Sequence, residues 1–129
     1  MSNMVSSTRK EGKKYDLEER LVRFAALIIK YCQSLPDDNT GQYYARQLMR
    51  SGGSAALNFG EAQGTFTDKD YVHKVSLTLK ELKESRVILK IMNFVDYGDK
   101  YRTGQLLSEA EELIRIMASI IKKKSHKIQ

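Results

Sequence analysis

Metal chemistry in this chain would have to begin from two histidines and one neighbouring carboxylate. Asp70 and His73 stand three residues apart, which is the spacing of half a di-iron site on a helix. Such a site in a helical bundle needs two Glu-x-x-His pairs and two further inward glutamates. The other histidine, His126, lies near the C-terminus, and His73 falls on the outward side of its segment. We therefore expect no metal site and no cofactor.

The sequence also gives little support for a catalytic nucleophile. Cys32 lies on the apolar side of the first segment with no histidine within sequence reach, so we expect a buried core thiol. The sequence has no Gly-x-Ser-x-Gly motif and no second inward histidine that could act as a base. It therefore predicts no catalytic residues and a protein that is not an enzyme. An unrecognised hydrolase or transferase is an alternative, which a pocket containing a strongly shifted carboxylate would support.

Basic side chains are candidates for contacts with phosphate, because each one can neutralise one backbone charge. The candidate nucleic-acid-binding residues are Lys69, Lys80, Lys83, Lys90, Arg46, Arg50, Lys122, Lys123 and Lys124. The four lysines of the third segment share one stripe with His73, opposite the apolar side. No aromatic residue interleaves with them, so base stacking is not indicated. The alternative is a solvated helix face.

Arg86 stands within the apolar arc of the third segment. An unpaired buried guanidinium is very costly, so it should meet a carboxylate or leave through an interface. Glu61 and Glu81 are the partners that we expect. We interpret Arg86, Glu61 and Glu81 as a structural polar network, with a catalytic role as the alternative.

The stretch RSGGSAALNFGE, residues 50–61, could be a phosphate-binding loop or a helix. A P-loop needs Gly-Lys-Ser/Thr at a fixed offset after a buried strand, and neither Gly52 nor Gly53 offers it. Small and apolar residues instead recur on one side of a helical wheel, straight through the glycines. They are Ala45, Leu48, Met49, Gly52, Ala55, Ala56, Phe59 and Ala62. The pattern predicts a helix whose small residues let a neighbouring helix come close.

The opposite side of the same segment carries Arg46, Arg50, Ser54, Leu57 and Glu61. Leu57 stands among charged residues, which indicates that something covers it. We interpret these five residues as candidates for an interface with another subunit. A solvated face with one stray leucine is the alternative.

Four helical segments must position these residues, because turn-like clusters at 36–39, 64–67 and 96–99 divide the chain. Asp16 with Glu19 has the capping-box spacing at the start of the first segment, and Thr67 with Asp70 begins the third. No segment shows the alternation of a strand. We predict helices at about 16–35, 40–62, 68–95 and 103–122, which form an all-α, antiparallel up-down-up-down four-helix bundle.

The chain of 129 residues has a net charge of +6, and the charge is concentrated at its ends. Four cations against Glu11 give residues 1–15 a charge of +3, and four lysines give residues 122–129 a charge of +4, which leaves −1 for the body. We expect a flexible basic N-terminal tail (1–15), the bundle (16–121) and a basic C-terminal tail (122–129). Such tails either attract phosphate or are simply frayed ends.

The N-terminal stretch MSNMVSSTRK has no apolar run, and the chain has a single cysteine. A secretory signal and a disulfide framework are therefore not expected. The most apolar patch, residues 24–29, is too short to span a bilayer. We expect a cytoplasmic protein with no membrane partner.

Three stretches, YDLEERLVRFA, RQLMRSGGSAALNFGEAQ and DYVHKVSLTLKELKESRVILKIM, resemble in the same order the four-helix-bundle proteins known as 23S rRNA intervening-sequence proteins. The resemblance covers residues 15–122 and is most specific in the Arg-Ser-Gly…Ser…Asn…Glu-Ala run. It implies a small bundle that assembles into a ring-shaped homopentamer. The sequence is also similar to the accessory variability determinant proteins of diversity-generating retroelements. That similarity implies a pentamer that binds nucleic acid and works with a reverse transcriptase.

These features predict a non-enzymatic homo-oligomer, expected to be a pentamer, that acts as a scaffold or binding protein. RNA or DNA is the leading class of partner. The alternative is a protein–protein adaptor that recruits another protein, such as a polymerase, without touching nucleic acid. The near-neutral body of the chain favours this alternative.

Overall fold

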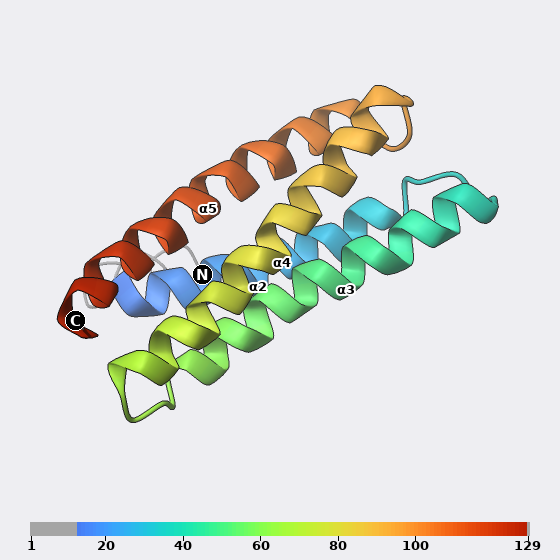
Figure 1. Cartoon of the computed structure of the whole chain (residues 1–129). Coiled ribbons are helices and arrows are strands. Elements are labelled where there is room, and N and C mark those ends of the chain that lie inside the picture. Colours follow the sequence, from blue (N-terminus) through green and yellow to red (C-terminus); the bar gives the residue numbers. More distant parts are fainter. Residues whose placement is uncertain (1–12, 129) are drawn as a thin grey trace, which may run out of the picture.

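Four long helices form an antiparallel bundle in the computed structural model, which describes residues 13–128 (Figure 1). They are α2 (Lys13–Cys32), α3 (Asn39–Ala62), α4 (Asp68–Phe94) and α5 (Lys100–Ile128). The described residues contain no strand. Short turns connect the helices, so that each runs back along its predecessor. The predicted all-α four-helix bundle is confirmed.

The two ends of the bundle hold different parts of the chain. The start of α2, the α3–α4 turn and the end of α5 share one end, and the other two turns lie at the opposite end (Figure 1). Asp38 caps α3 by accepting a hydrogen bond from the backbone N–H of Gly41 at 2.7 Å. Thr67 caps α4 through the N–H of Asp70 at 3.0 Å. The second of these caps is the one that the sequence predicted.

The first and last helices differ from the prediction at both of their ends, and the first ends at Cys32 rather than at residue 35. The first helix begins at Lys13, so Asp16 lies within it and is not its N-cap. The last helix begins at Lys100 because Asp99 accepts a hydrogen bond from the N–H of Arg102 at 3.0 Å. It continues to Ile128, so the predicted C-terminal tail is helical, and its basic last turn suits the helix dipole. The predicted N-terminal tail falls mainly in residues 1–12, outside the described residues.

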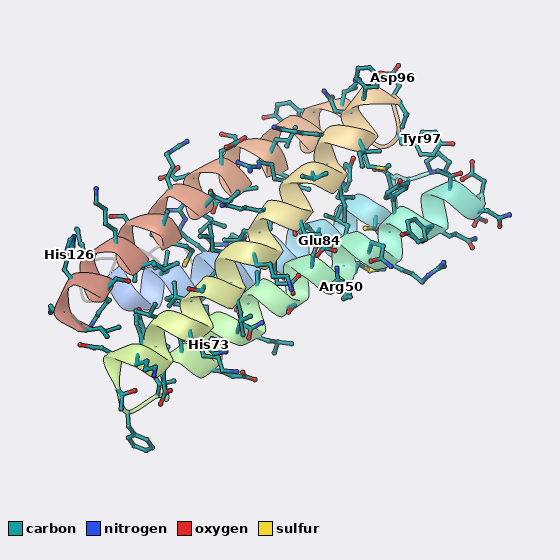
Figure 2. All side chains as sticks on the ribbon, viewed as in Figure 1. Arg50, His73, Glu84, Asp96, Tyr97 and His126 are labelled. Carbon is teal, nitrogen blue, oxygen red and sulfur yellow. The ribbon has the colours of Figure 1, made fainter. Side chains whose placement is uncertain are left out.

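The turn between α4 and α5 is tied to the turn between α2 and α3. Asp96 and Tyr97 lie in this turn (Figure 2). Asp96 and Gly98 both have positive φ angles, of 61° and 79°, which the tight reversal requires. The Tyr97 hydroxyl donates to the Asp38 carboxylate at 3.3 Å, and the negative charge of Asp38 raises the pKa of Tyr97. The backbone N–H of Asp99 donates to the hydroxyl of Ser34 at 3.1 Å. These bonds fix the register of the two helical hairpins at this end.

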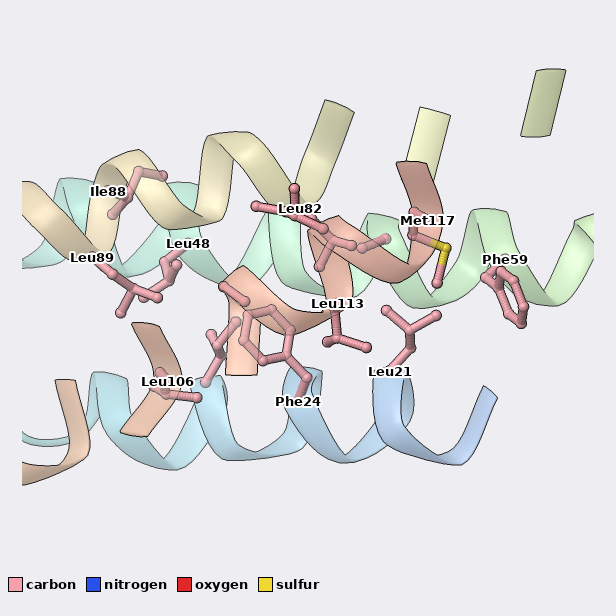
Figure 3. Close-up of a cluster of buried hydrophobic side chains, with 14 of the residues drawn as sticks. Leu21, Phe24, Leu48, Phe59, Leu82, Ile88, Leu89, Leu106, Leu113 and Met117 are labelled. Atoms are coloured by element: carbon pink, nitrogen blue, oxygen red, sulfur yellow. The ribbon is translucent and has the colours of Figure 1, made fainter. Parts of the chain in front are cut away.

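The core is built from the apolar seams that the sequence indicates (Figure 3). Each helix contributes its own set of buried side chains, which pack in one continuous cluster. The largest fully buried ones are Tyr31, Phe24, Phe59, Leu21, Ile28, Leu48, Leu82, Leu89, Met92, Leu113, Met117 and Val75. Met49 departs from its predicted place, because it lies at the edge of the α3 arc and is 38% exposed.

The glycine-rich stretch is continuous helix, as the sequence predicts. A Cβ on Gly52 would come within 2.5 Å of the Ile28 Cδ1 atom, so this glycine lets α2 and α3 approach closely. On the α4 side the hydroxyls of Ser51 and Ser85 share a buried hydrogen bond of 2.7 Å. A Cβ on Gly53, by contrast, would meet nothing within 4 Å. The stretch is therefore closely packed on two sides and open on a third.

Candidate binding surfaces

The predicted interface stripe lies on the outer side of α3. Arg46, Arg50, Leu57 and Glu61 are exposed, and Ser54 is half-buried. Leu57 is 69% exposed, so the apolar side chain is as uncovered within the chain as the sequence indicates. The structure thus brings the five residues together on one outward side of α3.

Two members of that stripe are held by α4. The Arg50 guanidinium contacts the carboxylates of both Glu81, at 3.3 Å, and Glu84 (Figure 2). Glu61 accepts from the ammonium of Lys74 at 2.6 Å. Arg50 is therefore less available to a phosphate than Arg46, which forms no ion pair within the described residues.

The predicted partners of Arg86 are wrong. Its guanidinium contacts Glu111 of α5 at 3.3 Å, while Glu61 and Glu81 pair with Lys74 and Arg50. The Arg86 Nε atom is buried and makes no hydrogen bond. Sequence spacing gives the side of a helix on which a residue lies, but not which neighbouring helix that side faces. The pair links α4 to α5.

The lysine stripe of α4 is exposed over its whole length. Lys69, His73, Lys80, Lys83 and Lys90 all face solvent. None of the four lysines forms an ion pair within residues 17–128. The stripe spans about 30 Å at 1.5 Å per residue, which is the length of several nucleotides. Its ammonium groups are thus free to meet phosphates.

The end of α5 forms a second basic surface. From Leu113 to Ile128 the helix has no carboxylate, and it carries Arg115, Lys122, Lys123, Lys124 and Lys127. Lys122 and Lys123 are exposed. Lys124 instead contacts Asp68 at 3.3 Å and lies 5.3 Å from the centre of the Tyr71 ring. This contact brings the end of α5 beside the start of α4, where Lys69 lies.

Reactive groups are scarce among the described residues. Burial raises the pKa of the Cys32 thiol to about 11, and the thiol lies 3.7 Å from the carbonyl oxygen of Ala45. A thiol of that pKa is protonated at neutral pH and is a poor nucleophile. His73 and His126 are both exposed, and within the described residues no three His, Cys, Asp or Glu side chains gather as a metal site. No described helix is long and apolar enough to cross a membrane.

One exposed surface was missed at the sequence level. Val22 and Ile29 lie on the outer side of α2 and are 50% and 52% exposed, and Ala26 between them is exposed too. The signal was present, because these residues follow a second apolar spacing of four and three beside the buried seam. A helix that is apolar on two opposite sides is typical of one that is covered twice.

The fold and these surfaces define a small four-helix bundle that presents apolar and basic faces. The sequence model for the 23S rRNA-intervening sequence proteins matches residues 13–119. The chain belongs to this family.

One solved structure supports the fold. It is the crystal structure of a protein with unknown function of the S23 ribosomal protein family from Bacteroides thetaiotaomicron VPI-5482. The two chains are 24% identical and superpose with a TM-score of 0.76, over 82% of this chain and 98% of the other. No curated protein matches the sequence.

Proposed function

We propose that this chain is a non-enzymatic, cytoplasmic scaffold that assembles into a homo-oligomer and binds nucleic acid through its lysine surfaces. The main support for an assembly is that Leu57 is exposed on a side of α3 that no other part of the described chain covers. An apolar side chain in that position is stabilised when another subunit buries it. A pentameric ring is the assembly that the family resemblance implies.

The nucleic-acid part rests on the two basic surfaces. The α4 stripe and the end of α5 together present Lys69, Lys80, Lys83, Lys90, Lys122 and Lys123 to solvent. Repetition around an oligomer multiplies these charges, so that modest affinity per subunit becomes substantial avidity. RNA and DNA are both compatible with contacts to phosphate alone.

Titration of single-stranded RNA and of duplex DNA at two salt concentrations tests this proposal. We expect binding that weakens steeply with salt and depends on lysines of both surfaces. Binding that survives removal of the α4 lysines, and disappears only when residues 1–15 and 122–129 are deleted, would reduce the interaction to attraction by the chain ends.

A protein–protein adaptor is the second candidate, and the charge distribution favours it. The body of the chain is close to neutral, and Arg50 and Lys124 are engaged in ion pairs. In this case the oligomer would recruit another protein, such as a polymerase. Affinity capture with nuclease treatment distinguishes the two, since a protein partner stays bound after RNA and DNA are digested.

A further inference from the structure

The lysine stripe of α4 includes exposed apolar side chains and ends in an aromatic ring. Five residues follow one another by three and four positions and form one row on the helix surface: Lys80, Lys83, Val87, Lys90 and Phe94. At 3.6 residues per turn, Phe94 lies within about 40° of each lysine in this row. Phe94 is 89% exposed, and Val87 is 51% exposed. We call these five residues the α4 row.

Phe94 lies at an end of α4 that backbone hydrogen bonds hold in place. The helix ends at Phe94, and the N–H of Val95 donates to the carbonyl of Ile91 at 3.1 Å. The N–H of Tyr97 donates to the carbonyl of Met92 at 2.9 Å, which closes the turn. The Phe94 ring is not among the described residues that form the core or pack against it. An ordered backbone therefore presents this ring to solvent.

The α4 row carries three ammonium groups and no carboxylate. Glu81 and Glu84, which lie between its members in the sequence, both contact Arg50 of α3. Asp96, just after the row, contacts Lys100 at 2.7 Å. The carboxylates nearest to the row in the sequence are thus engaged with other cations, so the row remains positive beside its exposed ring.

Ammonium groups and an aromatic ring recognise different parts of a nucleic acid. A lysine attracts the phosphates of any strand, whereas a ring on a protein surface stacks on a base that is unpaired. The bases of a duplex stack on one another and present only their edges in the grooves. The α4 row offers both kinds of group over about 21 Å, at 1.5 Å per residue, which suits a few nucleotides of one strand.

We propose that the α4 row binds a single-stranded nucleic acid, with phosphates at Lys80, Lys83 and Lys90 and one base stacked on the ring of Phe94. The inference rests on the proposed function and deepens it, because it names the form of nucleic acid that this surface takes. RNA and DNA share this chemistry. Base stacking was not expected from the sequence, since no aromatic residue stands between the lysines, but Phe94 follows the last of them by one helical turn.

The variant Phe94→Ala separates stacking from charge. In the full-length protein we expect it to lower the affinity for oligothymidylate and oligouridylate by about 5- to 100-fold. The salt slope and the affinity for duplex DNA should not change, because no phosphate contact is lost. Lys90→Gln should instead lower the salt slope for single strands by about 0.7 and weaken duplex binding too. The oligonucleotide that binds the native protein more tightly identifies DNA or RNA as the preferred strand.

The matched control is Phe66→Ala. Phe66 is 100% exposed, but it lies in the α3–α4 turn, at the other end of α4 from Phe94. We expect its replacement to leave the affinity for single strands unchanged. Both positions are exposed, so both variants should fold, which circular dichroism checks.

Fluorescence reports the stacking directly. The chain contains no tryptophan, so Phe94→Trp places a single indole at the proposed site. We expect this variant to keep the affinity of the native protein for single strands, since an indole also stacks on bases. Its emission should be quenched by oligothymidylate or oligouridylate and not by duplex DNA.

The results distinguish a failure of this inference from a failure of the proposed function. Unchanged single-strand affinity in Phe94→Ala, or an equal loss in Phe66→Ala, overturns the stacking and leaves the phosphate contacts standing. A lower molar mass of Phe94→Ala in light scattering would place Phe94 in a contact between copies and also overturn the stacking. A native protein that binds neither single strands nor duplex DNA overturns this inference and the nucleic-acid part of the proposed function together.

Discussion

Gly52 and Gly104 are both glycines within helices, yet their surroundings differ sharply. The position that a Cβ would take on Gly52 lies 2.5 Å from Ile28, whereas that on Gly104 is open. We expect Gly52→Ala to lower the free energy of unfolding by about 1–3 kcal/mol, because the buried side chain of Ile28 must shift to make room for the added methyl group. Gly104→Ala should raise it by roughly 0.5–1 kcal/mol through helix propensity. Urea denaturation of the two variants measures both changes, and equal effects would contradict the close packing of α2 on α3.

The reactivity of the Cys32 thiol tests whether its surroundings in the folded protein shield it from solvent. Its pKa is about 11 in the folded protein against 9.0 for an ordinary thiol, and burial is the cause. Because folding favours the neutral thiol, the contribution of Cys32 to the free energy of unfolding is fully present below pH 9 and is lost as the pH rises through 11. We expect an aromatic disulfide reagent at pH 8 to modify Cys32 far more slowly than in urea-unfolded protein. Equal rates would show that the thiol is accessible and not buried.

Single residues also show which features can be predicted from the sequence and which cannot. The buried seams and the outward position of Leu57 follow from helical periodicity, and the structure agrees with both. The partner of Arg86 did not follow, because a choice among Glu61, Glu81 and Glu111 requires the heights and rotations of packed helices. Long-range pairs depend on the tertiary arrangement, which spacing within one helix does not encode.

Helix α2 packs closely on α3, and its link to α5 includes one well-formed ion pair. The Arg20 Nε and Nη2 atoms donate to Glu109 at 3.0 and 2.8 Å, and these hydrogen bonds raise the pKa of Arg20. We expect Glu109→Gln to lower the free energy of unfolding by about 1 kcal/mol. Glu112→Gln is the control, since that carboxylate is 3.6 Å away and more exposed. If Glu112→Gln lowers the free energy of unfolding as much as Glu109→Gln does, the doubly hydrogen-bonded pair of Arg20 and Glu109 has no special role.

In the C-terminal part of α5, Lys124 makes contacts within the chain, whereas Lys122 and Lys123 are exposed to solvent. Replacing Lys122 and Lys123 by Gln should reduce the salt slope for duplex DNA by about 0.9 for each phosphate that is no longer neutralised, with little change in stability. Lys124→Gln should instead leave the slope nearly unchanged and weaken the packing against Asp68 and Tyr71. A larger decrease of the slope in Lys124→Gln than in the double variant would contradict this assignment.

Element boundaries were predicted where a strong local signal exists and missed where two signals compete. Thr67 with Asp70 marked the start of α4 correctly. The capping-box spacing of Asp16 and Glu19 was misleading, because the preceding lysines also favour a helix and α2 begins at Lys13. The exposed apolar side of α2 was missed because one apolar seam on each helix already accounts for a four-helix bundle.

At the scale of the whole molecule, the bundle combines a well-packed interior with exposed apolar side chains on the outer sides of α2 and α3 and with two basic surfaces. The interior explains why the chain folds. The exposed apolar side chains are explained if copies of the chain cover one another. Membership of the 23S rRNA-intervening sequence protein family agrees with the fold.

The molar mass of the full-length protein at micromolar concentration, determined by light scattering, is the most direct test of the proposed assembly. The proposal predicts one species with a mass several times 14.8 kDa, fivefold for a pentamer, and its reduction to a single chain in Leu57→Asp. A native protein that elutes as one species of 14.8 kDa would contradict it.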